Sequence, residues 1–295
     1  MLSRPSRGQP ARAETVAGTV SAAEPQSKPA EPRYDLSNIT LPAEGQAAIG
    51  VVDDTTYNTP NEHPAPIASV TKIITALAVM KKTPFQPGES GGTITITQQD
   101  EKYYHKYFAL NGTLTGITAG QQISQYEMLQ AILLASSNNL ADTLVDHYFG
   151  STNEYLAYAN TMLREDFGLN NTHVADASGF SPESVSTPSD MLVIGRKALE
   201  NPVIADIVDQ VSANTSFAGE LPNYNLLITE PEVNGIKPGF TEQAGYCLLF
   251  SAELPNKDGQ KVTFIGMVMG QQYRPTYYDT VHRFLDEART TIGKQ

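Results

Sequence analysis

A lysine lies three residues after a serine inside a mostly apolar stretch, and this pair most constrains how the chain can fold. The stretch, residues 66–77, reads Pro-Ile-Ala-Ser-Val-Thr-Lys-Ile-Ile-Thr-Ala-Leu and predicts a helix. Residues three apart share a helical face, so the Ser69 hydroxyl and the Lys72 amine can meet. A serine hydroxyl needs an adjacent base to act as a nucleophile, and a lysine becomes that base when burial or a second cation lowers its pKa. The alternative is a first-turn serine with a lysine that extends its amine to solvent.

Two later segments favour the catalytic interpretation of that pair. Residues 136–138 read Ser-Ser-Asn and follow an apolar stretch at 129–135. Residues 237–241 read Lys-Pro-Gly-Phe-Thr and open an apolar segment that ends at Phe250. Taken in chain order, the three segments correspond to S-x-x-K, S-D-N and K-T-G, the signature of class A β-lactamases and penicillin-binding proteins. The middle motif here is S-x-N.

On these motifs the chain resembles the D-alanyl-D-alanine carboxypeptidases, the low-molecular-mass penicillin-binding proteins, over about residues 40–290. Residues 176–191 resemble the loop and helix before that family's third motif, and residues 235–248 resemble its strand and hairpin. The resemblance implies a serine-type carboxypeptidase that removes the terminal D-alanine of peptidoglycan stem peptides through an acyl-enzyme. It also implies β-lactam antibiotics as covalent inhibitors.

The resemblance assigns catalytic roles to three residues. Ser69 is the nucleophile, Lys72 takes its proton, and Ser136 relays a proton toward the leaving D-alanine. From the residues alone, a cap at a helix end is the favoured interpretation of Ser136.

Substrate binding is assigned to the second and third motifs. Asn138 would donate its amide to the substrate peptide. Lys237 would supply positive charge near the substrate carboxylate and help to lower the pKa of Lys72, although a solvated strand end would also explain it. The backbone N–H groups of Ser69 and Phe240 would form an oxyanion hole, and Gly239 would let substrate approach the strand.

Pro238 departs from the family pattern, which has Thr or Ser at this position of K-T-G. The change removes a hydroxyl expected to bind the substrate carboxylate, and it removes a backbone donor. N–H groups two residues apart in a strand point the same way. If the N–H of Phe240 faces the cleft, an N–H at position 238 would also have faced the cleft, away from the sheet. Proline, which lacks this N–H, is therefore tolerated at 238 on a sheet edge. We hypothesise that Thr241 supplies the missing hydroxyl.

Two other functions stay open. A class A-like serine β-lactamase would use a loop glutamate to activate water, and Glu183 is the only glutamate in residues 176–190. The residues after Glu183 do not form the glutamate-x-x-leucine-asparagine sequence that we expect in such an enzyme. The sequence therefore favours slow release of β-lactams over their hydrolysis. Pro238 also leaves room for a catalytically weak penicillin-binding or cell-wall-binding protein.

The pattern of elements predicts an α/β fold of the α+β type, similar to β-lactamases and transpeptidases. An antiparallel sheet from both chain ends would be covered by helices and joined to an all-helical lobe. Strands are expected at 46–53, 93–97, 224–229, 235–239, 246–253 and 262–270. Helices are expected after Ser69, Ser124 and Ser151, at 139–149, after Thr187 and at 277–292.

The composition argues against several classes of partner and cofactor. The net charge is −12 without basic runs, which argues against nucleic acid. The five histidines lack zinc spacing and no nucleotide-binding glycine loop occurs, so we expect no metal and no cofactor. Cys247, the single cysteine, lies in an apolar segment and predicts a buried thiol. We expect a monomer.

The first 34 residues differ from the rest. They are rich in Ser, Pro, Ala and Arg, which predicts a disordered arm or linker at 1–34 before a catalytic domain at 35–295. This segment has no apolar signal-peptide region, and no stretch of the chain is apolar enough to span a bilayer. The resemblance nevertheless implies an extracytoplasmic location, because the family's substrate lies there.

Overall fold

The structure is a computed structural model that describes Met1 and residues 33–52, 54, 56–60 and 62–295. The arm predicted at 1–34 lies almost entirely outside the described residues. The chain divides into two units, Met1–Glu31 and Pro32–Gln295, and every helix and strand of the described residues lies in the second.

Five of the described strands form one antiparallel sheet in the order β2-β1-β11-β10-β9. They are β2 (Thr56–Asn58), β1 (Gln46–Val51), β11 (Lys261–Gln271), β10 (Gly245–Pro255) and β9 (Val233–Thr241). Strand β1 pairs with β11, so the two ends of the second unit meet in the middle of the sheet, as the sequence predicted. Strand β9 forms one edge.

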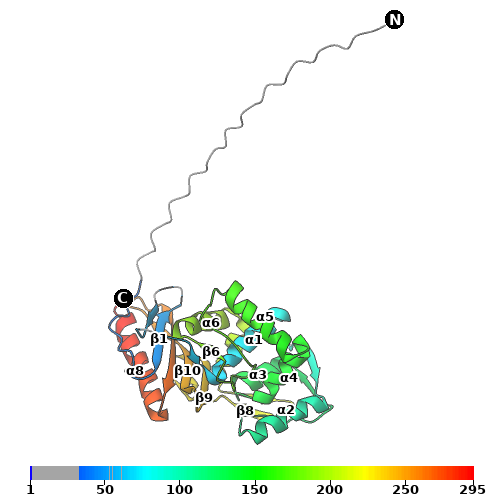
Figure 1. The fold of residues 1–295 in the computed structure, drawn as a ribbon. Helices are drawn as coiled ribbons and strands as arrows, with labels where there is room; N and C mark the ends of the chain where they lie inside the picture. Colours follow the sequence, from blue (N-terminus) through cyan, green and yellow to red (C-terminus); the bar gives the residue numbers. More distant parts are fainter. Residues whose placement is uncertain (2–32, 53, 55, 61) are drawn as a thin grey trace. The chain divides into compact units, whose positions relative to one another are not determined.

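Helices cover both faces of this sheet, which explains its apolar sequence. Helix α8 (Arg274–Ile292) packs on β10 and β11, and helix α6 (Pro188–Glu200) packs on the opposite face against β1 and β11 (Figure 1). Along β1, Ile49 is buried with the α8 cluster and its neighbour Ala48 with the α6 cluster. Alternate residues therefore face different layers, and both must be apolar.

The remaining elements lie mostly between β1 and β9 in the chain and build the helical lobe. Its helices are η1 (Ala68–Val70), α1 (Thr71–Lys82), α2 (Gln98–Ala109), α3 (Gln125–Leu133), α4 (Asn138–Phe149), α5 (Thr152–Thr161), the π-helix Met162–Asp166, α7 (Pro202–Val208) and η3 (Leu226–Thr229). Three two-stranded antiparallel sheets accompany them: β3 (Ala65–Pro66) with β6 (Val185–Ser186), β4 (Thr93–Thr95) with β5 (Gln122–Ser124), and β7 (Ser212–Thr215) with β8 (Gly219–Pro222).

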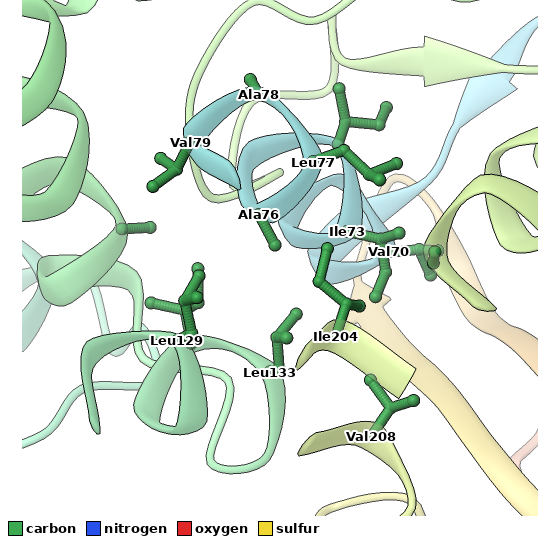
Figure 2. Close-up of a cluster of buried hydrophobic side chains, with 14 of the residues drawn as sticks. Val70, Ile73, Ala76, Leu77, Ala78, Val79, Leu129, Leu133, Ile204 and Val208 are labelled. Carbon is green, nitrogen blue, oxygen red and sulfur yellow. The ribbon is translucent and has the colours of Figure 1, made fainter. Parts of the chain in front are cut away.

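Helix α1 is the centre of this lobe. Figure 2 shows Ile73 and Ala76 of α1 close to side chains of α3 and α7, among them Leu133 and Ile204. Helix α1 has ten buried residues of its twelve, and it also packs on α4, α5 and α6. A helix that is apolar on almost every side is a buried one. A lysine in its first turn is therefore held away from bulk water.

The predicted helix starts and stops are mostly confirmed by side-chain caps. The Ser124 hydroxyl accepts from the backbone N–H of Glu127, and the Glu127 carboxylate accepts in return, so the capping box at α3 is present. Thr187 caps α6 with Pro188 at its first position. Gly150 ends α4 with a φ of 85°, a conformation that favours glycine.

One predicted strand is wrong. Residues 224–229 do not form a strand, because their last four residues form the short helix η3. The Asn225 side chain accepts from the N–H of Leu227 and donates to the carbonyl oxygen of Gly235, which fixes a turn. The apolar residues here are also consecutive instead of alternating, and Leu226 is exposed.

Candidate active site

The strand-to-helix turn at Ser69 fixes the first motif. Residue Ala68 has a φ of 48°, and η1 leads directly into α1. The loop of residues 176–184 packs against this turn: a Cβ added to Gly179 would lie 1.8 Å from the carbonyl oxygen of Ala68. Gly179 also has a φ of 76°, so only glycine suits the position. This contact sets Ser69 at the start of a buried helix.

The Lys72 amine has three oxygen partners from three separate parts of the chain. Its Nζ lies 2.9 Å from Ser69 Oγ, 2.7 Å from Asn138 Oδ1 and 2.7 Å from the carbonyl oxygen of Ser178. The predicted meeting of Ser69 and Lys72 is therefore present. The side chain is wholly buried and does not extend to solvent.

Burial changes the protonation of this amine. Removal from water disfavours the charged form and lowers the pKa of Lys72 to about 7. The carboxylates of Asp176 and Asp142 act in the opposite direction and limit the fall in this pKa. A large share of Lys72 is thus uncharged near neutral pH.

The second motif lies in the turn between α3 and α4, as predicted. Ser136 is buried and has a φ of 60°, a strained conformation for a residue with a Cβ. Asn138 is the first residue of α4, and its N–H donates to the carbonyl oxygen of Thr113. The next residue, Asn139, exchanges hydrogen bonds with both backbone groups of Thr115. The turn and the loop at 113–115 are held together in this way.

The third motif lies on the edge strand β9. Lys237 is wholly buried, and its Nζ has no hydrogen-bond partner among the described residues. Burial, and then the proximity of Lys72, lower the pKa of Lys237 well below its usual value. Gly239 faces Ser69, because a Cβ there would lie 2.9 Å from the backbone nitrogen of Ser69.

The remaining third-motif residues lie on both faces of β9: Pro238 and Phe240 share one face, and Thr241 lies on the other. Pro238 pairs with Leu248 and Phe240 with Tyr246 in the register of β9 and β10. The Phe240 side chain is 51% exposed, and its ring lies 4.4 Å from that of Tyr246. Thr241 shares the face of Lys237 and Gly239 by alternation, and its hydroxyl accepts from the N–H of Ala244.

A cleft of about 330 Å³ joins these segments. It is lined by the motif residues Ser69, Ser136, Lys237, Pro238, Gly239 and Phe240, and by residues that the motifs did not indicate: Thr113, Tyr224, Tyr246, Arg274, Tyr277 and Tyr278. No acidic residue lines it among the described residues, although the chain carries a net charge of −12. The cleft is thus suited to an anionic ligand with an apolar portion.

Four residues considered from the sequence do not line this cleft. Lys72 and Asn138 are buried behind Ser69, and Lys72 Nζ contacts both Ser69 Oγ and Asn138 Oδ1. Thr241 is not part of its wall, and Glu183 is exposed on the loop of residues 176–184, where its N–H donates to Ser181 Oγ. The position of Glu183 gives no support to a β-lactamase that uses it to activate water. Within the described part of the chain, no cluster of His, Cys, Asp or Glu could hold a metal ion, and no helix is long and apolar enough to cross a membrane.

Comparison with known proteins agrees with this geometry. Residues 45–272 match the Peptidase_S11 family, described as D-alanyl-D-alanine carboxypeptidase. The D-alanyl-D-alanine carboxypeptidase DacF of Bacillus subtilis is 30% identical over 76% of this chain and 58% of its own length. A D-alanyl-D-alanine endopeptidase of Escherichia coli is 27% identical over 65% of this chain and 61% of its own length. The chain thus spans about three fifths of the length of these relatives.

Solved structures share the fold. The Streptomyces K15 DD-transpeptidase superimposes with a TM-score of 0.74 over 85% of this chain and all of its own, at 23% identity. A D-alanyl-D-alanine carboxypeptidase from Mycobacterium tuberculosis superimposes with a TM-score of 0.73 over 88% of this chain and 96% of its own, at 21% identity. The chain belongs to the D-alanyl-D-alanine carboxypeptidase family, which confirms the resemblance carried by the three motifs.

Gly239 offers a direct test of this packing. In Gly239→Ala, the new methyl group would meet the backbone nitrogen of Ser69 and the Cβ of Ala68 at 3.1 Å. We expect the free energy of unfolding in urea to fall by about 1–3 kcal/mol, because a backbone nitrogen and an alanine Cβ cannot rotate away from the new methyl group. Gly116→Ala is the control, since nothing lies within 4 Å of its added Cβ. Equal stability of the two variants would contradict the described approach of β9 to η1.

Proposed function

We propose that the chain is a serine-type D-Ala-D-Ala carboxypeptidase that removes the terminal D-alanine of peptidoglycan stem peptides through an acyl-enzyme on Ser69. The observation that carries the proposal is a buried amine 2.9 Å from a serine hydroxyl, with its pKa lowered to about 7. Family membership supports the same activity. The substrate lies outside the cytoplasmic membrane, so we propose an extracytoplasmic location.

Lys72 is the proposed base. An uncharged amine has two N–H groups and one lone pair. Two of its neighbours, Asn138 Oδ1 and the Ser178 carbonyl oxygen, can only accept, so they take the two N–H groups. The lone pair is then left for the Ser69 hydroxyl, the one partner that can donate.

Acylation follows from that arrangement. Ser69 Oγ attacks the carbonyl carbon of the terminal peptide bond while its proton passes to Lys72 Nζ. The C–N bond then breaks, and the leaving D-alanine nitrogen receives a proton through Ser136, which lines the same cleft as Ser69. Water hydrolyses the resulting ester, releases the shortened peptide and returns the hydroxyl to Ser69.

The backbone N–H groups of Ser69 and Phe240 are the proposed oxyanion hole. Pro238 has no N–H, so its backbone nitrogen makes no hydrogen bond to β10. Residue 240 is two positions further along the strand, so its N–H points to the same side as the nitrogen of Pro238. Strand β9 is at the edge of the sheet, with β10 on one side and the cleft on the other. The N–H of Phe240 that points away from β10 therefore faces the cleft. Gly239 lets β9 approach the backbone nitrogen of Ser69 closely, because a Cβ at this position would lie 2.9 Å from that nitrogen.

Lys237 is the proposed partner of the substrate carboxylate. Its buried Nζ lines the cleft without a protein partner among the described residues, and an arriving carboxylate would favour its charged form. Thr241 lies on the same face of β9 but outside the cleft wall, so it does not replace the hydroxyl that Pro238 lacks. Asn138 would direct its remaining amide N–H groups to the substrate peptide.

A penicillin-binding protein with little turnover is the second candidate, and Pro238 is the observation that favours it. The missing hydroxyl weakens recognition of the carboxylate, and the loss of one charge-assisted hydrogen bond costs about 1.5–3 kcal/mol. This candidate shares acylation of Ser69 with the first. It differs in the release of D-alanine.

Intact mass spectrometry after exposure to benzylpenicillin tests the nucleophile. We expect one stable adduct on the parent chain and none on Ser69→Ala, because the hydroxyl is the acylated group. Release of D-alanine from a stem-pentapeptide analogue then separates the two candidates: turnover supports the carboxypeptidase, and its absence supports the binder. An adduct that persists in Ser69→Ala would refute the assignment of Ser69.

The pH dependence of acylation tests the base. The uncharged form of Lys72 is the reactive one, so the rate constant for acylation should rise tenfold per pH unit below about 7 and level off above it. Rapid mixing with a chromogenic β-lactam gives this profile. A rate that keeps rising toward the usual pKa of lysine would contradict a base that burial has made available near neutral pH.

A further inference from the structure

A salt bridge lies behind the Lys72 amine. Lys106 Nζ on α2 lies 2.9 Å from Asp142 Oδ2 on α4. The Asp142 side chain is only 5% exposed, whereas that of Lys106 is 50% exposed. A nearly buried carboxylate is thus neutralised by a lysine that reaches in from the surface.

This pair is connected to Lys72 by two routes. Asp142 follows Asn138 by four residues on α4, so both lie on one face of the helix, and Asn138 Oδ1 is a partner of Lys72. On the second route, Lys106 Nζ lies 4.5 Å from the centre of the Tyr107 ring. The Tyr107 hydroxyl lies 3.3 Å from Ser178 Oγ, and the carbonyl oxygen of Ser178 is another partner of Lys72.

We propose that Lys106 and Asp142 are a positioning pair for the reaction: Lys106 neutralises the carboxylate behind Lys72 and so keeps the Lys72 amine free to take the proton of Ser69. The inference rests on the proposed function and adds to it a pair of residues outside the three motifs. Neither residue lines the cleft, and we assign neither of them a contact with substrate.

The charges around Lys72 give the direction of the effect. Asp142 raises the pKa of Lys72, while burial raises the pKa of Asp142 itself and Lys106 lowers it. The loop contributes Asp176, whose carboxylate already accepts from the backbone N–H groups of residues 178–180. Lys237 of β9 interacts electrostatically with Lys72, and Tyr107 of α2 and Tyr155 of α5 interact with the two carboxylates. Among the described residues, Asp142 is the only one of these two carboxylates with a lysine partner.

Removal of Lys106 should therefore leave a negative charge that favours protonated Lys72. In Lys106→Gln we expect the midpoint of the pH profile of acylation to rise by about half to one pH unit. Below the midpoint, acylation would be about three- to tenfold slower. Asp142→Asn should move the midpoint down. The double variant should return it close to the parent value, because both charges are then absent.

Lys102→Gln is the matched control, because Lys102 is an exposed lysine one turn earlier on α2 whose Nζ donates a hydrogen bond to Gln99 and to no other residue that the structure describes. Its midpoint should equal that of the parent, and Lys106→Arg should also preserve it. An unchanged or lowered midpoint in Lys106→Gln would overturn the proposal. If that variant fails to fold, Asp142→Asn decides, and an unmoved midpoint there would overturn it too. A parent chain that is never acylated would refute the proposed function and this inference together.

Discussion

The site depends on one interaction, the contact of a wholly buried lysine amine with three oxygen atoms. Two of the oxygens belong to acceptors and the third to the Ser69 hydroxyl. Each comes from a different part of the chain, so the contact exists only when η1, α4 and the loop of residues 176–184 are assembled around α1. Burial in that assembly is also what lowers the pKa of Lys72. Fold and reactivity are consequences of the same packing.

Local patterns were sufficient to predict the parts of this arrangement that span a few residues. The spacing of Ser69 and Lys72 is a property of one helix, and the caps at Ser124 and Thr187 are short-range hydrogen bonds. The sheet was predictable because strands buried on both faces are continuously apolar, and the family resemblance placed the Lys237 strand beside Ser69. The edge position of β9 also explains how Pro238 is accommodated.

Other parts depend on contacts that the sequence does not display. The strand predicted at 224–229 is a short helix, because Asn225 bonds to Gly235 ten residues away. Helix α2 was not predicted, since it is largely polar and starts at a capping box that Thr97 forms with Asp100. Two tyrosines of the cleft wall, Tyr277 and Tyr278, come from α8, and only the three-dimensional fold brings Tyr277 beside Tyr246 of β10. The pairing of Lys106 with Asp142 is hidden for the same reason.

The central claim is that Lys72 loses its proton near neutral pH in the folded chain, and its titration by NMR tests this most directly. Lysine labelled with ¹³C at Cε gives one signal per side chain, and the signal absent from Lys72→Gln identifies this residue. The account predicts a midpoint near 7, because burial lowers the pKa of Lys72 to about 7. A midpoint close to 10.5, the usual value for lysine, would contradict it.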